Sequence, residues 1–241
     1  MANSLPRLTF LQRSIMLLTV QLLLLAMSIP ANARNEPRWT RRKEARPEEI
    51  TAAALELFVE RGFAATRLED VAARAGVSKG TVYLYFANKE DLFKAVVREG
   101  LVSPIAEMKR FVAQFQGSSF ELLRMLVLGW WDRVGATRVA GIPKLLLGES
   151  GNFPELVRFY LAEVVEPGHD VMIGIVKRGI GRGEFRKVNA EDAALLIFAP
   201  LLQLMLWRSA LEPQSTHKLD AARYLETHLD MLEHGLGAEL E

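Results

Sequence analysis

The chain of 241 residues contains no cysteine. This absence excludes disulfide bonds, catalysis by a thiolate and zinc sites that depend on cysteine ligands. Histidine is also scarce, since the chain has four, and no two of them have the H-E-x-x-H spacing of a zinc-binding helix. No nucleophile–base pair or carboxylate dyad stands in a supporting context. The sequence therefore predicts no metal, no cofactor and no enzymatic activity.

The chain also lacks a large excess of charge of either sign, since its formal net charge is +1. The charge is unevenly distributed: residues 1–37 and 38–100 each carry about +2, and residues 101–241 about −3. The basic excess is concentrated in the run RWTRRKEAR at residues 38–46. A run of this kind suits both a solvated arm and contact with phosphate, and composition alone leaves both interpretations open.

The N-terminal residues 1–37 resemble the start of an exported protein. Two arginines precede an apolar run at residues 15–29, and the ANA at residues 31–33 resembles a small-residue cleavage site. The run is short for a permanent membrane span, which needs about 20 apolar residues. Translation from Met27 would remove nearly all of it and leave a polar, basic tail. We expect an over-extended start, so that this leader is not part of the mature protein.

Helical periodicity begins at Pro47. One apolar stripe at helical spacing consists of Ile50, Ala54, Leu57 and Phe58. Pro47 suits the first turn of this helix and Gly62 suits its end. Thr66 and Glu69 then have the spacing of a capping box, which predicts the start of a second, shorter helix.

The stretch AGVSKG at residues 75–80 predicts a tight turn between two short helices. Gly76 suits the left-handed conformation that ends a helix, and Ser78 suits the cap of the next one. A short helix, a three-residue turn that begins with glycine and another short helix form the pattern of a helix-turn-helix. This pattern alone leaves DNA binding and a plain helical corner equally open.

The next helix, KGTVYLYF at residues 79–86, favours DNA binding. Val82 and Phe86 are four residues apart and can face the core, which leaves a lysine, a glycine, a threonine and two tyrosines toward the outside. Glycine allows close approach of the backbone, lysine can reach guanine acceptors, and phenols can donate to phosphate. The residues ANKED follow, in which Asn88 suits the cap of a longer helix.

The segment from Ile50 to Val97 closely resembles the DNA-binding domain of the tetracycline-repressor (TetR/AcrR) family of bacterial regulators. The resemblance has no gaps, and its core is AGVSKGTVYLYFANKEDL. It implies DNA contacts by the residues at matching positions, which are Thr66, Lys79, Gly80, Thr81, Tyr83, Leu84, Tyr85 and Lys89. Among these, the groove-facing set is Lys79, Gly80, Thr81 and Tyr83, and the phosphate contacts are Thr66, Tyr83, Tyr85 and Lys89.

The remaining two thirds of the chain show helical patterns and no strand-like alternation. Helices are expected at residues 103–116, 119–134, 190–211 and 217–236, with Ser103 as a cap. Residues 153–185 are expected to form a long helix or a helix pair, interrupted or kinked at Pro167–Gly168. We therefore predict an all-α protein. Residues 38–98 form an N-terminal three-helix helix-turn-helix domain, and residues 99–241 form a C-terminal helical bundle for effector binding and dimerisation.

The helix at 190–211 is apolar on nearly all sides, which predicts burial against a partner as well as the core. In the resembled family the last long helices pair across a two-fold axis. The predicted homodimer interface comprises Leu195, Phe198, Leu202, Met205 and Leu206. The family also implies a small, mostly apolar effector within the bundle. The candidate pocket residues, each also explained as ordinary core, are Trp130, Trp131, Phe159, Tyr160, Met172 and Trp207.

Together these features predict a cytoplasmic, ligand-responsive regulator. Its dimer would bind a palindromic operator in double-stranded DNA, and effector binding would release this repressor. An exported or membrane-tethered small-molecule-binding protein is the alternative if the leader is genuine. The helix at residues 79–86 argues against this alternative, because an exported protein does not need a DNA-binding surface. We expect no stable association with a membrane.

Overall fold

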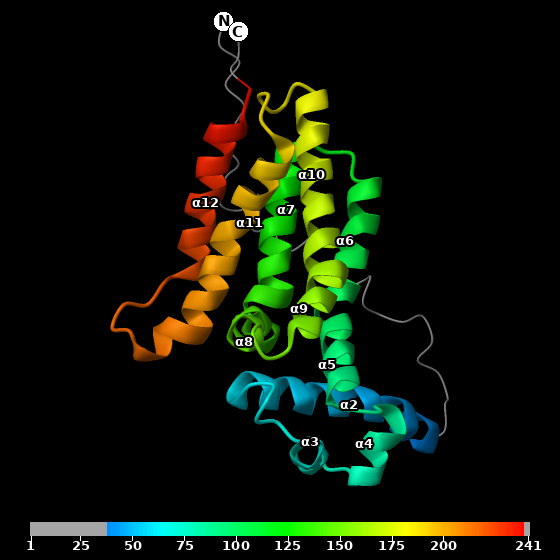
Figure 1. Cartoon of the computed structure of the whole chain (residues 1–241). Coiled ribbons are helices and arrows are strands. Elements are labelled where there is room, and N and C mark those ends of the chain that lie inside the picture. Colours follow the sequence, from blue (N-terminus) through cyan, green and yellow to red (C-terminus); the bar gives the residue numbers. More distant parts are fainter. Residues whose placement is uncertain (1–37, 239–241) are drawn as a thin grey trace, which may run out of the picture. The chain divides into compact units, whose positions relative to one another are not determined.

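The structure is a computed structural model that describes residues 38–238, with the side chains described from Pro47 onward (Figure 1). The predicted leader lies outside the described residues. Within residues 38–238 every named element is a helix, and the strand-like pairing is limited to one isolated bridge between Phe185 and Gly237. The prediction of an all-α fold is confirmed.

The N-terminal helices are α2 (Arg38–Arg61), α3 (Leu68–Arg74), α4 (Lys79–Tyr85) and α5 (Lys89–Val97). Figure 1 shows α3 and α4 next to each other on one side of α2. The prediction that Pro47 occupies a first turn is wrong, because α2 already begins at Arg38 and contains Pro47 in its interior. A proline there removes one backbone hydrogen bond, and the helix continues past this loss.

Three phenylalanine rings form the centre of the N-terminal core. The ring centroids of Phe58, Phe63 and Phe93 lie 5.5–5.6 Å apart, and each side chain is at most 1% exposed. Phe153 packs edge-on against Phe63 at 4.8 Å between centroids. Because Phe153 belongs to the C-terminal part, this contact joins the core of the N-terminal helices to that of the bundle.

The bundle consists of α6 (Ser103–Gln114), α7 (Ser119–Trp130), α8 (Ile142–Glu149), α9 (Pro154–Tyr160), α10 (Glu166–Gly181), α11 (Ala190–Leu206) and α12 (Ala221–Leu236). Wider π-helical turns extend or join these helices: η1 (Arg98–Val102), η2 (Trp131–Gly135), η4 (Leu161–Val165) and η5 (Trp207–Leu211). Short 3-10 turns lie at η3 (Arg138–Gly141) and η6 (Glu212–Gln214). α10 packs against α6, α7 and α11, and α12 packs against α7 and α11 (Figure 1).

Two predicted helix breaks differ from the structure. Ser103 does not cap a helix, because η1 continues α5 directly into α6 and leaves no helix end there. Pro167 lies at the start of α10, which continues directly from η4 without a helix end. The wide π-helical turn of η4 lies just before the proline, so the irregularity near Pro167–Gly168 is a local change of helical pitch and not a break.

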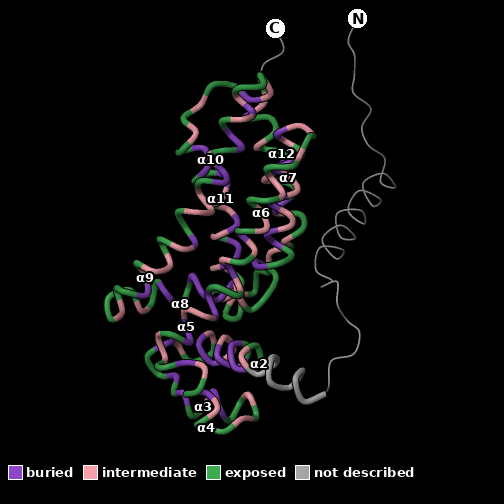
Figure 2. Tube along the Cα trace, turned by 90° about the vertical axis from the view of Figure 1, so that its right-hand side faces the viewer, coloured by how far each residue is buried: buried purple, intermediate pink, exposed green. Residues whose placement is uncertain are grey.

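Helix α11 exposes large apolar side chains on its outer face. Figure 2 marks the buried and exposed residues along its Cα trace. Leu195 is 57% exposed and Leu196 is 69% exposed, whereas Ile197 and Leu201 are buried. By length and composition alone, Ala190–Gln214 could cross a membrane, and 28% of its most apolar window is buried in the protein. An exposed apolar face of this kind is typical of an interaction surface.

Candidate nucleic-acid interface

The turn between α3 and α4 is held by local backbone and side-chain contacts. Gly76 has φ +67°, in the left-handed region that residues with a Cβ rarely adopt. The amide of Val77 donates to the carbonyl of Ala72 at 3.0 Å, and the Ser78 hydroxyl accepts from the amide of Thr81 at 3.1 Å. The predicted roles of Gly76 and Ser78 are confirmed, and the turn fixes the direction in which α4 leaves α3.

Helix α4 has one buried face and one solvent-facing side. Val82 is fully buried and Phe86, which follows the helix, is 9% exposed. On the outside, Tyr83 is 46% exposed and Leu84 is 74% exposed. Lys79 and Gly80 are also exposed, and Thr81 and Tyr85 are partly buried. A short helix that presents its aromatic and apolar side chains to solvent provides a surface for a macromolecular partner rather than for water.

Lys79, the first residue of α4, forms an ion pair with Glu69 of α3. Its Nζ also lies 5.6 Å from the centroid of the Tyr83 ring. The hydrogen bond to Glu69 raises the pKa of Lys79 above its ordinary value, and the same bond lowers the pKa of Glu69. Lys79 is therefore a fully charged ammonium group at the N-terminal end of α4.

The helix-turn-helix segment also has known relatives. Residues 50–96 match the family described as bacterial regulatory proteins, tetR family. The chain is 29% identical over 162 residues to the fatty acid metabolism regulator protein of Bacillus subtilis (strain 168), a match that covers 66% of this chain and 82% of that protein. It is 42% identical over 126 residues to the transcriptional regulator RutR of Escherichia coli (strain K12), covering 49% and 59% of the two chains. The crystal structure of the regulator FadR from Bacillus subtilis, in complex with stearoyl-CoA, has a TM-score of 0.66 at 25% identity, over 78% of this chain and 98% of that one.

Residues 50–96 are a DNA-binding domain of the TetR family of bacterial regulatory proteins. The predicted family is thus confirmed. The relatives are transcriptional regulators and not enzymes, in agreement with the prediction for this chain.

Two residues implied by the resemblance make contacts within the N-terminal helices of this structure. Thr66 is 1% exposed, and its hydroxyl donates to the carbonyl of Gly62 at 2.7 Å. The predicted capping box with Glu69 is wrong, because the N-cap of α3 is Arg67 and no side chain caps it. Thr66 instead satisfies carbonyls at the end of α2. Its contact with phosphate stays a prediction.

Lys89 is the second of these residues. Its ammonium group donates to the carbonyls of Phe63 at 2.7 Å and Ala64 at 3.0 Å, and lies 4.5 Å from the centroid of the Phe63 ring. Burial lowers the pKa of Lys89. The resemblance implies a phosphate contact for the Lys89 ammonium group. In this structure the same group holds the α2–α3 connector in place. Asn88, by contrast, caps α5 as predicted, since its side chain accepts from the amide of Asp91 at 2.8 Å.

Replacing Lys89 by methionine distinguishes a structural role from a phosphate contact. We expect Lys89→Met to lower the free energy of unfolding by about 1–3 kcal/mol, because two carbonyls lose their donor. The slope of log K against log salt for DNA binding should stay unchanged, since no counterion is displaced through this residue. Urea unfolding and salt titrations of duplex binding measure both quantities. A shallower slope with unchanged stability would contradict this placement.

The six candidate pocket residues differ in burial. Three of them are buried in the bundle: Trp130, Trp131 and Met172. Phe159 is partly buried, and the guanidinium carbon of Arg98 lies 5.1 Å from its ring centroid. The ring of Trp207 lies 6.2 Å from that of His217, near the end of α11. Burial raises the pKa of Tyr160 to about 12, so its hydroxyl stays neutral.

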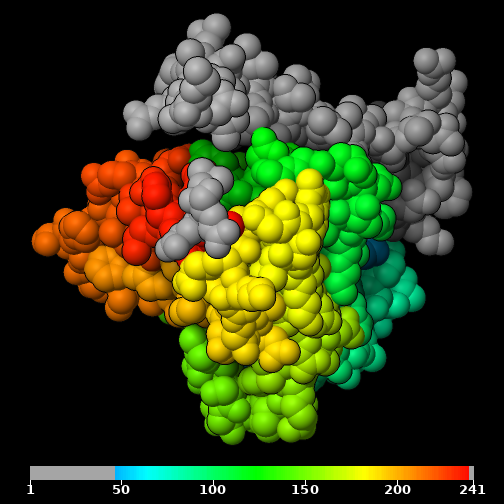
Figure 3. Space-filling view, turned by 90° about the horizontal axis from the view of Figure 1, so that it is seen from above, coloured from blue at the N-terminus to red at the C-terminus, as the bar shows by residue number. Residues whose placement is uncertain are grey.

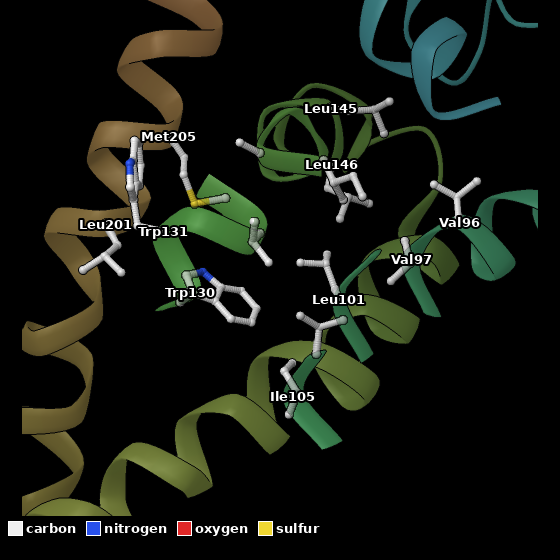
Figure 4. Packing of buried hydrophobic residues seen from close by; sticks show 14 of the residues in the cluster. Val96, Val97, Leu101, Ile105, Trp130, Trp131, Leu145, Leu146, Leu201 and Met205 are labelled. Carbon is white, nitrogen blue, oxygen red and sulfur yellow. The ribbon is translucent and has the colours of Figure 1, made fainter. Parts of the chain in front are cut away.

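Trp130 has the feature most relevant to a ligand. Figure 4 shows Trp130 and Met205 in the same interior region as Leu101 and Leu146. The indole N–H groups of Trp130 and Trp207 are buried, and neither has a hydrogen-bond partner among the described residues. Buried donors are usually paired, so an acceptor on a bound molecule would satisfy them.

A surface groove of about 300 Å³ lies elsewhere, between α11 and α12. Its lining residues are Pro200, Leu219, Asp220, Arg223, Tyr224, Thr227, His228 and Met231. None of the six candidate pocket residues is among them. Figure 3 shows these C-terminal helices, in orange and red, side by side at the surface. The groove thus belongs to the outer face of α11 and α12.

The predicted dimer residues divide between this outer face and the core. Leu195 is exposed, and three others are partly buried: Phe198, Leu202 and Leu206. Met205 is 2% exposed, so it belongs to the core of the subunit and is not available to a partner. Met231 of α12, which is 69% exposed, is absent from the predicted set. In the sequence, Met231 can be recognised as a large apolar residue that lies outside the apolar stripe of Leu225 and Leu229.

Proposed function

We propose that this regulator is a repressor that binds a palindromic operator as a homodimer and is released by a small, mostly apolar effector. In this proposal residues 38–98 read the DNA, and residues 99–241 bind the effector and form the dimer. The protein then works in the cytoplasm, where its operator is. The observation that carries the proposal is the outward side of α4, where Lys79, Tyr83 and Leu84 are exposed while Val82 anchors the helix.

The apolar outer face of α11 and α12 supports the homodimer. Leu195, Leu196 and Met231 together expose a large apolar surface, and a second copy of the same face would remove it from water. A two-fold dimer also suits the DNA, because two identical recognition helices about 34 Å apart meet successive major grooves of a palindromic site.

Direct contacts between the bundle and the α2–α3 connector support control by an effector. Glu149, at the end of α8, accepts from the amide of Ala64 at 2.9 Å, and Phe153 packs on Phe63. A ligand that binds one arrangement of α8 and α9 better than another would therefore shift the position of the DNA-binding helices. The related FadR structure contains stearoyl-CoA, which has a long apolar acyl chain and a polar, charged coenzyme A part. The unpaired indole N–H of Trp130 suits an effector with at least one hydrogen-bond acceptor.

Substitutions in α4 test the proposed DNA contacts. The operator is first obtained by selection from a random duplex library. We expect Tyr83→Ala to weaken binding to all duplexes by about 1 kcal/mol per contact, because a phosphate contact carries no sequence information. Lys79→Ala should instead change the preference among sites, at a cost of about 1–3 kcal/mol at the base that it reads.

The matched control is Leu147→Ala in α8, whose side chain is 64% exposed and lies outside the helix-turn-helix. It should leave operator affinity unchanged. Intact operator affinity in the double variant Tyr83→Ala, Tyr85→Ala would refute the assigned contacts.

A further inference from the structure

The ion pair between Glu69 and Lys79 lies at the DNA-facing end of the recognition helix. Glu69 comes from α3 and Lys79 is the first residue of α4. Both side chains are accessible, with exposed fractions of 50% and 57% respectively. In a helix-turn-helix, the N-terminal residues of the second helix meet the base edges. The Glu69 carboxylate therefore lies at the surface that faces DNA, which is itself negatively charged.

Folding gives this carboxylate only a small role. Glu69 lies in the first turn of α3, where a negative charge favours the helix dipole, but Asp70 lies there as well. The turn between α3 and α4 is already held by the left-handed Gly76 and the Ser78 cap. An exposed ion pair adds little to stability. Affinity for DNA does not explain it either, because a negative charge beside phosphates opposes binding. The remaining consequence of the pair is its effect on Lys79.

The ion pair with Glu69 reduces the binding free energy that the Lys79 ammonium can gain from DNA phosphates. Binding of lysine to phosphate is driven by the release of condensed counterions, and an ammonium already neutralised by a carboxylate gains little from it. The acceptors of guanine, O6 and N7, are uncharged. An ammonium group has three donors, so Lys79 can keep its bond to Glu69 and still donate to both guanine acceptors. The adjacent Tyr83 ring, 5.6 Å from Nζ, further restricts where the ammonium lies.

We propose that Glu69 is a specificity-determining residue, which makes Lys79 a reader of guanine rather than a binder of phosphate. This inference rests on the proposed DNA-binding function and extends it to a residue outside the recognition helix. Glu69 thereby lowers the affinity for non-operator DNA more than the affinity for the operator.

The test is Glu69→Gln in the full-length protein, with a random-sequence duplex and the selected operator as the two probes. Near 0.15 M salt, we expect affinity for the random duplex to rise about fivefold per bound subunit, and the slope of log K against log salt to steepen by about 0.9. Operator affinity should rise less, so that the ratio of operator to random-duplex affinity falls.

The matched control is Glu60→Gln, which removes the same charge from the same domain. Glu60 pairs with Arg74 at 3.2 Å and with Arg138 of the bundle at 3.7 Å, so its carboxylate neutralises other cations than Lys79. Its effect on both probes should be small.

Two results would overturn the inference while leaving the DNA-binding function intact. The first is that Glu69→Gln and Glu60→Gln change the affinities for the two duplexes by the same factors. The second is an undiminished gain from Glu69→Gln in a Lys79→Ala background, which would show that the carboxylate acts on phosphates directly and not through Lys79. Absence of saturable binding of the unaltered protein to any duplex would instead refute the proposed function itself.

Discussion

Phe63→Ala is expected to lower the free energy of unfolding by about 3–5 kcal/mol, a large share of the total for a domain of this size. The side chain is fully buried and its ring contacts those of Phe58, Phe93 and Phe153. Its removal would leave a cavity where the N-terminal helices meet the bundle. It would also remove the ring over which the Lys89 ammonium lies.

Urea unfolding monitored by circular dichroism measures this loss. Phe63→Leu is the matched variant and should cost less, because it retains most of the buried apolar volume. Leu84→Ala should change stability by less than about 0.5 kcal/mol, since Leu84 is 74% exposed. A loss below about 1 kcal/mol for Phe63→Ala would mean that the two parts of the chain do not share this core.

The second large effect is expected for Leu196→Glu on α11. A carboxylate buried in an apolar interface without a partner costs several kcal/mol, so the proposed homodimer should dissociate. Operator affinity should fall about 100-fold, because the two DNA-binding domains would no longer be held together. The subunit itself should remain folded, since Leu196 is 69% exposed.

Sedimentation velocity gives the oligomeric state, and operator titration gives the affinity. Leu147→Glu is the control, because Leu147 is a leucine of similar exposure, 64%, on α8. It should preserve both the dimer and the affinity. A Leu196→Glu protein that stays dimeric at micromolar concentration would place the subunit interface elsewhere.

Residues whose partners are close in sequence were predictable. Gly76, Ser78 and Asn88 each act within about one turn of helix, through a left-handed conformation or a cap of the i to i+3 type. The buried Val82 and the exposed Tyr83 follow from the same local periodicity. The sequence by itself therefore determined the helix-turn-helix, the family and the outward face of α4.

Residues whose partners are distant in sequence were decided only by the tertiary structure. Lys89 contacts carbonyls 25 and 26 residues earlier, and these are available because the α2–α3 connector passes over the start of α5. Met205 becomes core and Met231 becomes surface because α11 and α12 pack in one particular rotation. The pairing of Glu69 with Lys79 likewise depends on the angle between α3 and α4. A sequence pattern specifies which face of a helix is apolar, and only packing specifies what that face meets.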